Sequence, residues 1–228
     1  MTRRRYAAYW APPELHALWE AGCAWLGRDA QHPRAVRRAA CEQTSQPRRY
    51  GFHATLKAPF ELREGCSEAC FVGAVEAIAA TMESFEMPPL VVDTLTDFVA
   101  LRPRQPIGAA HPLRRLADAC VRELDGLRRP LTAADADRRL AAMRHDGPGR
   151  AHLERWGYPH VFDAWRFHMT LSDSLPDAAE RERVADQARE FFAASLMQPL
   201  ACDAVSIFVE PAPGLPFEWT CRVALKTP

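Results

Sequence analysis

The sequence has 228 residues, of which 48% are hydrophobic and 25% charged, a composition that fits a soluble globular protein with a real core and excludes a disordered chain. Lysine plus arginine and aspartate plus glutamate each number 29, so the formal net charge is zero. Proteins that bind long nucleic acids usually carry a strong basic excess. We therefore expect a small or locally bound anion as the partner.

The N-terminal segment MTRRRYAAYWAPP lacks the apolar stretch and the small-residue cleavage site of a signal peptide. No segment reaches the ~18 consecutive apolar residues that a membrane-spanning helix needs. The seven cysteines are odd in number and widely scattered, which favours reduced thiols. These features predict a cytoplasmic protein without a membrane partner.

Hydrophobic periodicity and the positions of proline predict the elements of the first half in chain order. We expect a strand over 4–10, a helix over 14–26, an irregular arginine-rich stretch as far as 49, and a strand near 50–58. A helix over 70–82 follows. Residues 90–103 form either a strand pair or one long bent strand.

The second half has a similar order. A helical segment covers about 111–145, with a second helix starting near Thr132 as its N-cap. Residues 147–165 are less regular, and a strand near 165–172, a helix over 177–197 and strands over 201–211 and 217–228 close the chain. Each half thus holds a strand followed by a helix and further strands. We predict one α+β domain over 1–228, bilobal and pseudo-symmetric, with mostly antiparallel sheets and a groove between the lobes.

One short motif occurs in both halves, as FHATL over 52–56 and as FHMTL over 167–171. A lone His-x-Thr carries little information, but two copies with Phe before and Leu after are far beyond chance. Side chains alternate faces along a strand, so His53 and Thr55 share one face, as do His168 and Thr170. The hydrophobic residues between them point to the core. We expect the two polar faces to oppose each other across the groove.

The same alternation puts Lys57, Arg166 and Ser172 on these polar faces. Histidine titrates near neutral pH, so one ring can act as a base and the other as an acid in cleaving a phosphodiester. Threonine hydroxyls and a cation can bind the non-bridging oxygens. This inventory suits one phosphate group and needs neither a metal nor another cofactor.

The paired His-x-Thr motifs resemble those of the two-histidine phosphoesterase superfamily, which includes RNA 2',3'-cyclic phosphodiesterases and the so-called 2'-5' RNA ligases. The segments RYAAYWAPP, CAWLGRDA, RYGFHATLKAPF, RWGYPHVF and RFHMTLS are similar to the branch of phosphonate-metabolism proteins often found with carbon–phosphorus lyase genes. The resemblance covers nearly the whole chain. It implies a bilobal fold, metal-independent chemistry and catalytic positions at His53, Thr55, His168 and Thr170.

Other side chains carry weaker indications. His145, His152, His160 and His168 fit no metal-ligand spacing, so we predict no metal site. The stretch 102–155 holds twelve arginines against seven acids. Such a run is usually a solvated helix face, and the alternative is that part of it borders the groove and meets a second phosphate of the ligand. Tyr50 and Tyr158 either pack or stack on a sugar or base, and Trp156 and Trp165 are assigned to the core.

The sequence therefore predicts a hydrolase that opens a cyclic phosphodiester of a small sugar phosphate or nucleotide, with a cyclic ribose phosphate of phosphonate breakdown as the most specific candidate. The first alternative is an RNA-end enzyme acting on 2',3'-cyclic termini or 2'-5' linkages. The second is a non-catalytic nucleotide-binding module. The two motifs are equivalent at this level, so sequence does not tell the base from the acid.

Overall fold

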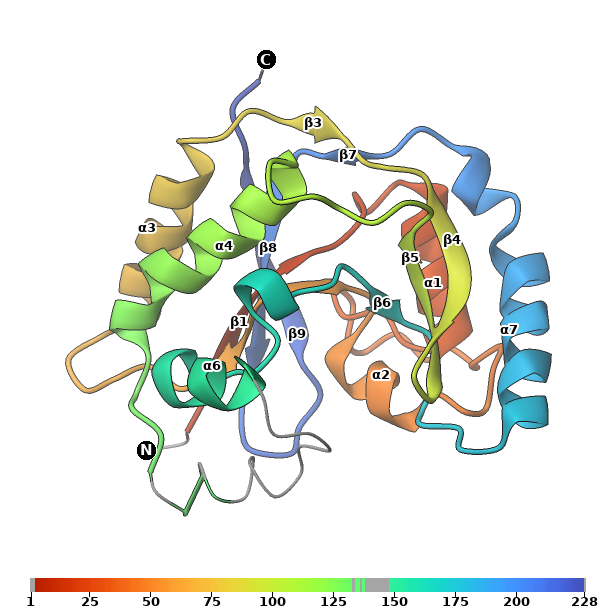
Figure 1. Ribbon diagram of the computed structural model, residues 1–228, viewed down its shortest axis with the longest axis horizontal. Coiled ribbons are helices and arrows are strands. Elements are labelled where there is room, and N and C mark those ends of the chain that lie inside the picture. The colour runs from red at the N-terminus through yellow and green to blue at the C-terminus, as the bar shows by residue number, and fades with distance from the viewer. Residues whose placement is uncertain (1–2, 133, 136, 138–147, 228) are drawn as a thin grey trace.

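The computed structural model describes residues 3–132, 134–135, 137 and 148–227 (Figure 1). Its centre is a seven-stranded sheet in the order β4-β5-β6-β2-β1-β8-β9, in which every pairing is antiparallel. The strands are β1 (Arg5–Trp10), β2 (Ala54–Phe60), β4 (Leu90–Leu95), β5 (Phe98–Pro103), β6 (Met169–Thr170), β8 (Ala204–Glu210) and β9 (Glu218–Ala224). A separate ribbon pairs β3 (Phe85–Glu86) with β7 (Ala201–Cys202).

Helices flank this sheet at its two ends. They are α1 (Ala17–Leu26), α2 (Ser45–Tyr50), α3 (Glu68–Ala79), α4 (Pro112–Leu124), α6 (Pro148–Trp156) and α7 (Ala178–Phe192), with 3-10 turns at Asp125–Leu127, Phe162–Ala164 and Ser195–Met197. The pair α3 and α4 packs against β2, β8 and β9, whereas α7 packs against β4 and β5 with α1 beside it (Figure 1). No helix among the described residues is long and apolar enough to span a membrane.

The predicted α+β class with mostly antiparallel strands is confirmed, because mixed helices surround an antiparallel sheet. Strands from both halves of the sequence join in one continuous sheet, and the division into two symmetric lobes stays a prediction. Residues 90–103 form the strand pair, β4 and β5, rather than one long strand. The hydroxyl of Thr132 accepts a hydrogen bond from the Asp135 amide at 3.1 Å, as an N-cap does, and the rest of the predicted second helix lies mostly outside the described residues.

Two helices fall where the sequence predicts irregular chain. The first, α2, begins with amides of Ser45 and Gln46 that donate to the Asp173 carboxylate at 3.0 and 2.6 Å. This cap comes from 128 residues away, so local sequence gives no sign of it. The second, α6, begins at Pro148, a favoured residue in the first helical turn.

The predicted second motif strand, near 165–172, is much shorter than expected, since β6 covers only Met169–Thr170. A 3-10 turn ends just before it at Ala164. The Trp165 indole then donates to the Thr55 carbonyl at 2.9 Å, so a side chain takes the place of a strand amide. The strand pairing therefore begins only after His168.

The helix α1 is fitted closely to the chain that leads into β2. An added Cβ on Gly22 would lie 2.1 Å from the Phe52 ring, which is itself stacked on Phe192 of α7 at 6.0 Å. All three residues are buried. The packing of α1 and α7 thus fixes the residue that precedes the first motif histidine.

We expect Gly22→Ala to destabilise the fold by about 1–3 kcal/mol, the usual cost of overpacking a close contact. Urea unfolding measures this change. Gly73→Ala in α3 is the matched control, since a Cβ there meets nothing within 4 Å and alanine favours a helix by up to about 1 kcal/mol. Equal stabilities of the two variants would contradict the close fit of α1 against Phe52.

Candidate functional site

The two motifs lie side by side in the sheet, because β2 and β6 are neighbours that pair at Ala54 and Met169. Continuing this antiparallel register by one residue in each direction sets His53 opposite Thr170 and Thr55 opposite His168. Directly opposite residues have Cβ atoms about 4.5–5.5 Å apart, and diagonal ones about 7–8 Å. The register therefore gathers two imidazoles and two hydroxyls on one face of two adjacent strands. This differs from the expectation of two faces opposed across a groove.

Burial follows the predicted alternation along both motifs. The hydrophobic members are buried: Phe52, Ala54, Leu56, Phe167, Met169 and Leu171. The four polar members, His53, Thr55, His168 and Thr170, are each partly exposed. The core residues of the motifs thus hold the polar ones at the surface of the sheet.

The backbone orients the first imidazole. His53 Nδ1 lies 2.9 Å from the Gly51 carbonyl oxygen, which can only accept, so Nδ1 carries a proton and donates it. In this neutral ring the lone pair on Nε2 accepts a hydrogen bond of 3.4 Å from the Thr55 hydroxyl. This nitrogen is available to take a proton.

The second imidazole repeats this arrangement. His168 Nδ1 lies 2.9 Å from the Arg166 carbonyl oxygen, again two residues before the histidine. The same tautomer follows, with Nε2 left for a ligand. The two rings are therefore held in equivalent ways by their own strands.

Both rings favour the neutral form in the free protein. Burial lowers the pKa of His53 to about 4, against a rise from the Gly51 hydrogen bond, and a charge on His168 lowers it further. Burial also lowers the pKa of His168, and a charge on His160 adds to this effect. The effect of the His168 charge on His53 agrees with the strand register, which places the two motifs on neighbouring strands.

Tyr9 is a part of the site that the sequence analysis missed. Its buried ring stacks on His53 with centroids 3.7 Å apart and an interplanar angle of 21°. Tyr9 pairs with Thr55 across β1 and β2, so it shares the polar face. Side-chain alternation in the predicted strand 4–10 indicates which of its residues share a face with Tyr9. It points to the site only when β1 is known to lie beside β2.

The chain just before the second motif adds two further residues. His160 affects the pKa of His168, and its ring lies 5.5 Å from that of Tyr158. Trp165 is buried, as predicted, and its indole holds the Thr55 carbonyl. The segment before β6 therefore borders the histidine pair and fastens the two motifs together.

Lys57 does not follow the predicted alternation. The pairing of β1 with β2 skips a residue between Tyr9–Thr55 and Ala8–Lys57, which marks a β-bulge that moves Lys57 off the face of Thr55. Its side chain is buried, and its ammonium donates to the Asp125 carboxylate at 3.0 Å and the Val121 carbonyl at 3.3 Å. Lys57 is thus held by the end of α4.

Ser172 and Arg166 are also engaged by the protein. The buried Ser172 hydroxyl accepts from the Val99 amide at 2.9 Å and donates to the Asp173 carbonyl at 2.8 Å. The exposed Arg166 donates from Nη1 to the carbonyls of Asp163 and Trp165 at 2.6 and 2.8 Å. These contacts give Ser172 a structural role and leave the other nitrogens of Arg166 toward the surface.

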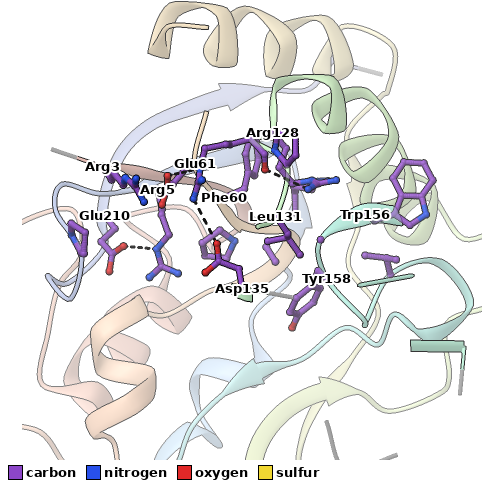
Figure 2. A pocket seen from close by; sticks show the side chains of 18 of the residues that line it. Arg3, Arg5, Phe60, Glu61, Arg128, Leu131, Asp135, Trp156, Tyr158 and Glu210 are labelled. Carbon is purple, nitrogen blue, oxygen red and sulfur yellow. Dashed lines mark hydrogen bonds and ion pairs between the residues drawn. The ribbon is translucent and has the colours of Figure 1, made fainter. Parts of the chain in front are cut away.

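Tyr158 lines an arginine-rich cavity of about 240 Å³ (Figure 2), whereas Tyr50 is not among the lining residues. The Tyr50 ring lies 6.4 Å from that of His53 and stacks on Phe217 at 5.2 Å. Tyr158 lines the cavity, and so does Trp156, which the sequence analysis assigned to the core but which is only partly buried. Tyr50 thus lies beside His53, and Tyr158 lies at the wall of the cavity.

Within the described part of the chain, no three His, Cys, Asp or Glu side chains gather in a way that would hold a metal ion. The groups that the site does offer are imidazoles, hydroxyls, aromatic rings and nearby guanidinium groups. Their chemistry fits proton transfer on a bound anion.

Comparison with known families decides where the chain belongs. Residues 55–218 match the family described as "Protein of unknown function (DUF1045)". The chain belongs to the DUF1045 family. The matched region contains Thr55 and the whole second motif.

Two relatives carry the name "Ribose 1,5-bisphosphate phosphokinase PhnN". The one from Janthinobacterium sp. (strain Marseille) is 38% identical over 94% of this chain and 49% of its own length. The one from Laribacter hongkongensis (strain HLHK9) is 37% identical over 96% of this chain and 51% of its own length. The chain spans about half the length of the curated relatives it matches. These matches agree with the resemblance to the phosphonate-metabolism branch of two-histidine phosphoesterases.

Among solved structures, the chain is similar to E. coli LigT. The complex with NADP+ aligns over 100% of both chains with a TM-score of 0.46 and 15% identity. The complex with 3'-AMP aligns over 100% of both chains with a TM-score of 0.45 and 16% identity.

The depressed pKa of His53 has a consequence for stability. The neutral form is favoured in the folded protein and the ordinary pKa of about 6.5 returns on unfolding, so the contribution of this ring is complete above pH 6.5 and is lost as pH falls towards 4. We expect His53→Gln to remove that pH dependence, which urea unfolding between pH 4 and 7 measures. Proton titration of the ring by NMR, with a midpoint near 4 that rises in His168→Gln, checks the same point. A His53 midpoint near 6.5 would contradict it.

Proposed function

We propose that the protein is a metal-independent phosphodiesterase that hydrolyses a cyclic phosphodiester of a small sugar phosphate or nucleotide. The observation that carries the proposal is the pairing of β2 with β6 at Ala54 and Met169, which sets two backbone-anchored imidazoles and two threonine hydroxyls on one face. Each Nδ1 is occupied by a carbonyl, so each Nε2 is left for proton transfer. An acid and a base on a single anion are what opening a cyclic phosphodiester needs.

In the proposed reaction, the anionic substrate lies between the two Nε2 atoms. Its negative charge favours the imidazolium form of one ring, which raises that pKa from its depressed value in the free protein. Thr55 and Thr170 donate hydrogen bonds to the non-bridging oxygens. A water oxygen then bonds to phosphorus and the bond to the ring oxygen breaks. One Nε2 takes the proton of the water, and the other gives a proton to the leaving oxygen.

The surroundings of the two rings differ, although the motifs do not. Burial, to which the stacked Tyr9 ring contributes, and the charge of His168 both disfavour a second proton on the His53 ring. His168 is partly exposed like His53, but its aromatic neighbour, Phe98, lies at a longer centroid distance of 5.7 Å. We assign the base to His53 and the acid to His168.

The names of the relatives support a ribose phosphate as the substrate class. They refer to ribose 1,5-bisphosphate and to a kinase, but this chain matches only about half of each relative. It contains no G-x-x-x-x-G-K-[ST] loop, the usual phosphate-binding loop of nucleotide-dependent kinases that use a P-loop. We therefore assign the kinase chemistry to the unmatched part of the relatives and a phosphodiesterase step on a related ribose phosphate to this chain.

His53→Ala and His168→Ala should each lower kcat on a cyclic phosphate by about 10²–10⁴-fold, the usual contribution of one acid or base. Thr55→Ala and Thr170→Ala should have smaller effects, because each removes one hydrogen bond. The rate of ring opening to the phosphomonoester is measured on a panel of substrates. The panel contains ribose 1,2-cyclic phosphate and nucleoside 2',3'-cyclic phosphates. His32→Ala, an exposed histidine outside the site, is the control. Wild-type rates in either motif variant would refute the assignment.

The pH dependence separates the base from the acid. In the wild type, kcat/KM should fall at low pH as His53 of the free enzyme gains a proton, with that limb well below 6.5 because its pKa is about 4. His53→Ala should lose the acid limb and His168→Ala the alkaline limb. The reverse pattern would exchange the two roles without affecting the reaction class.

Activity should also persist in excess EDTA, since the groups of the site supply proton transfer and anion binding themselves. Rates with and without the chelator are compared after dialysis, with a zinc hydrolase as the positive control. Loss of activity in EDTA and recovery with zinc or manganese would contradict metal independence.

A further inference from the structure

Among the described residues, six cations and three carboxylates line the cavity that Tyr158 borders (Figure 2). The cations are Arg3, Arg5, Arg49, Lys57, Arg128 and Arg129, and the carboxylates are Glu61, Asp135 and Glu210. The lining thus has an excess of three positive charges in a chain whose formal net charge is zero. A concentration of one sign of charge in a concave surface favours a small ligand of the opposite sign.

Two arginines of the lining, Arg5 and Arg49, share a single carboxylate. That carboxylate positions both side chains but neutralises only one charge. Arg5 and Arg49 both donate to Glu210, at 2.5 Å each, and Glu210 is completely buried. Burial alone would raise the pKa of Glu210, but the two arginines lower it below its ordinary value. Glu210 therefore stays charged and fixes two guanidinium groups while cancelling one of their charges.

One polar atom of this group lacks a partner. Arg49 Nε is buried and makes no hydrogen bond, although its Nη2 is bonded to Glu210. A buried donor without a partner costs free energy, so a bound acceptor would be stabilising there. A phosphate oxygen is a suitable acceptor, since arginine binds phosphate through several N–H groups at once.

The opposite wall carries a second pair with the same excess. Lys57 and Arg128 both donate to Asp125, at 3.0 and 2.9 Å. Asp125 also meets the exposed Arg155 at 3.3 Å. Among the described lining residues, Arg129 differs, because it pairs with two carboxylates, Glu61 and Asp135. Positive charge therefore remains on both sides of the cavity.

Two residues of the cavity wall, Arg5 and Arg49, lie close in sequence to residues that contact or contain the first imidazole. Arg5 and Tyr9 lie on the same face of β1, four residues and roughly 13 Å apart, and Tyr9 stacks on His53. Arg49 is likewise four residues before His53. Between them, Phe217 lies 5.3 Å from the Arg5 guanidinium and stacks on Tyr50, whose ring is 6.4 Å from His53. The Arg49 guanidinium lies 5.6 Å from the Tyr50 ring centroid, so Tyr50 lies between Arg49 and the imidazole, and Phe217 and Tyr50 lie between Arg5 and the imidazole.

We propose that this cavity binds a second, terminal phosphate of the substrate, so that the protein acts on a cyclic phosphodiester that carries a phosphomonoester at its other end. The inference rests on the proposed function for the scissile phosphate, and it adds the substrate class. The volume of about 240 Å³ suits a phosphate and part of a sugar. It is below the ~300–1,000 Å³ of pockets that enclose a drug-sized ligand, which disfavours an oligonucleotide there.

The test compares two matched substrate pairs. Ribose 1,2-cyclic phosphate is compared with its 5-phosphate, and adenosine 2',3'-cyclic phosphate with its 5'-phosphate. For each pair, the ratio of kcat/KM with the terminal phosphate to kcat/KM without it is the measured preference. We expect a preference of about tenfold or more in at least one pair, the range of one hydrogen bond to a charged group. A ratio near one in both pairs overturns the proposal.

Two variants locate the preference. Arg49→Gln should reduce the ratio by about tenfold or more, because it removes a guanidinium while Arg5 still neutralises Glu210. Arg183→Gln on α7, an exposed arginine that does not line the cavity, should leave the ratio unchanged. An unchanged ratio in Arg49→Gln, with the fold intact by circular dichroism, places the terminal phosphate elsewhere and contradicts the proposal.

Binding of ribose 5-phosphate separates this inference from the proposed reaction, because this probe has a terminal phosphate but no scissile bond. By calorimetry, the wild type and His53→Ala should bind it with similar affinity, and Arg49→Gln should bind it at least tenfold more weakly. If no cyclic phosphate is hydrolysed but this arginine-dependent binding is found, the phosphodiesterase proposal fails and the cavity proposal stands. If hydrolysis is found without preference and without this binding, only the cavity proposal fails.

Discussion

The site depends on one backbone pairing, that of Ala54 in β2 with Met169 in β6. Because side chains alternate along a strand, this register puts both histidines and both threonines on one face. A slip of one residue would turn one motif over and send its histidine into the core. The buried residues that flank the motifs prevent such a slip, since Phe52, Leu56, Phe167 and Leu171 fit only one register. The hydrophobic half of each motif is therefore as necessary to the site as the polar half.

The pairing is reinforced from outside the two strands. The Trp165 indole bonds to the Thr55 carbonyl, and the Asp173 carboxylate caps α2 just ahead of the first motif. Both bonds join residues more than a hundred positions apart in sequence. Two residues of the second half of the chain, Trp165 and Asp173, thus bond to the first motif and to the helix that precedes it. These bonds tie the two motifs together.

Alternation and motif repetition predicted the α+β class, the buried members of both motifs and the two histidine positions that the structure brings together. They could not predict that the strands are neighbours, because pairing partners are set by tertiary packing. Lys57 was misplaced for a related reason, since a β-bulge against β1 moves it to the side of α4, where Asp125 binds it. The helix α2 was missed because its cap is remote. Side-chain alternation puts Tyr9 on one definite face of its strand. That this is the face of the histidines follows only from the sheet order, in which β1 lies beside β2.

The stack of Tyr9 on His53 affects how the proposed enzyme returns to its starting state. Each hydrolysis would leave His53 with an extra proton and His168 without one, so the two must exchange before the next cycle. The tyrosine ring, 3.7 Å away, together with the Gly51 carbonyl, prevents the imidazole from turning over to pass its proton elsewhere. Once the phosphate has left, however, the same surroundings lower the pKa of this ring to about 4, and the proton departs to water at neutral pH. In the proposed cycle, product departure would therefore be the event that releases the proton of His53.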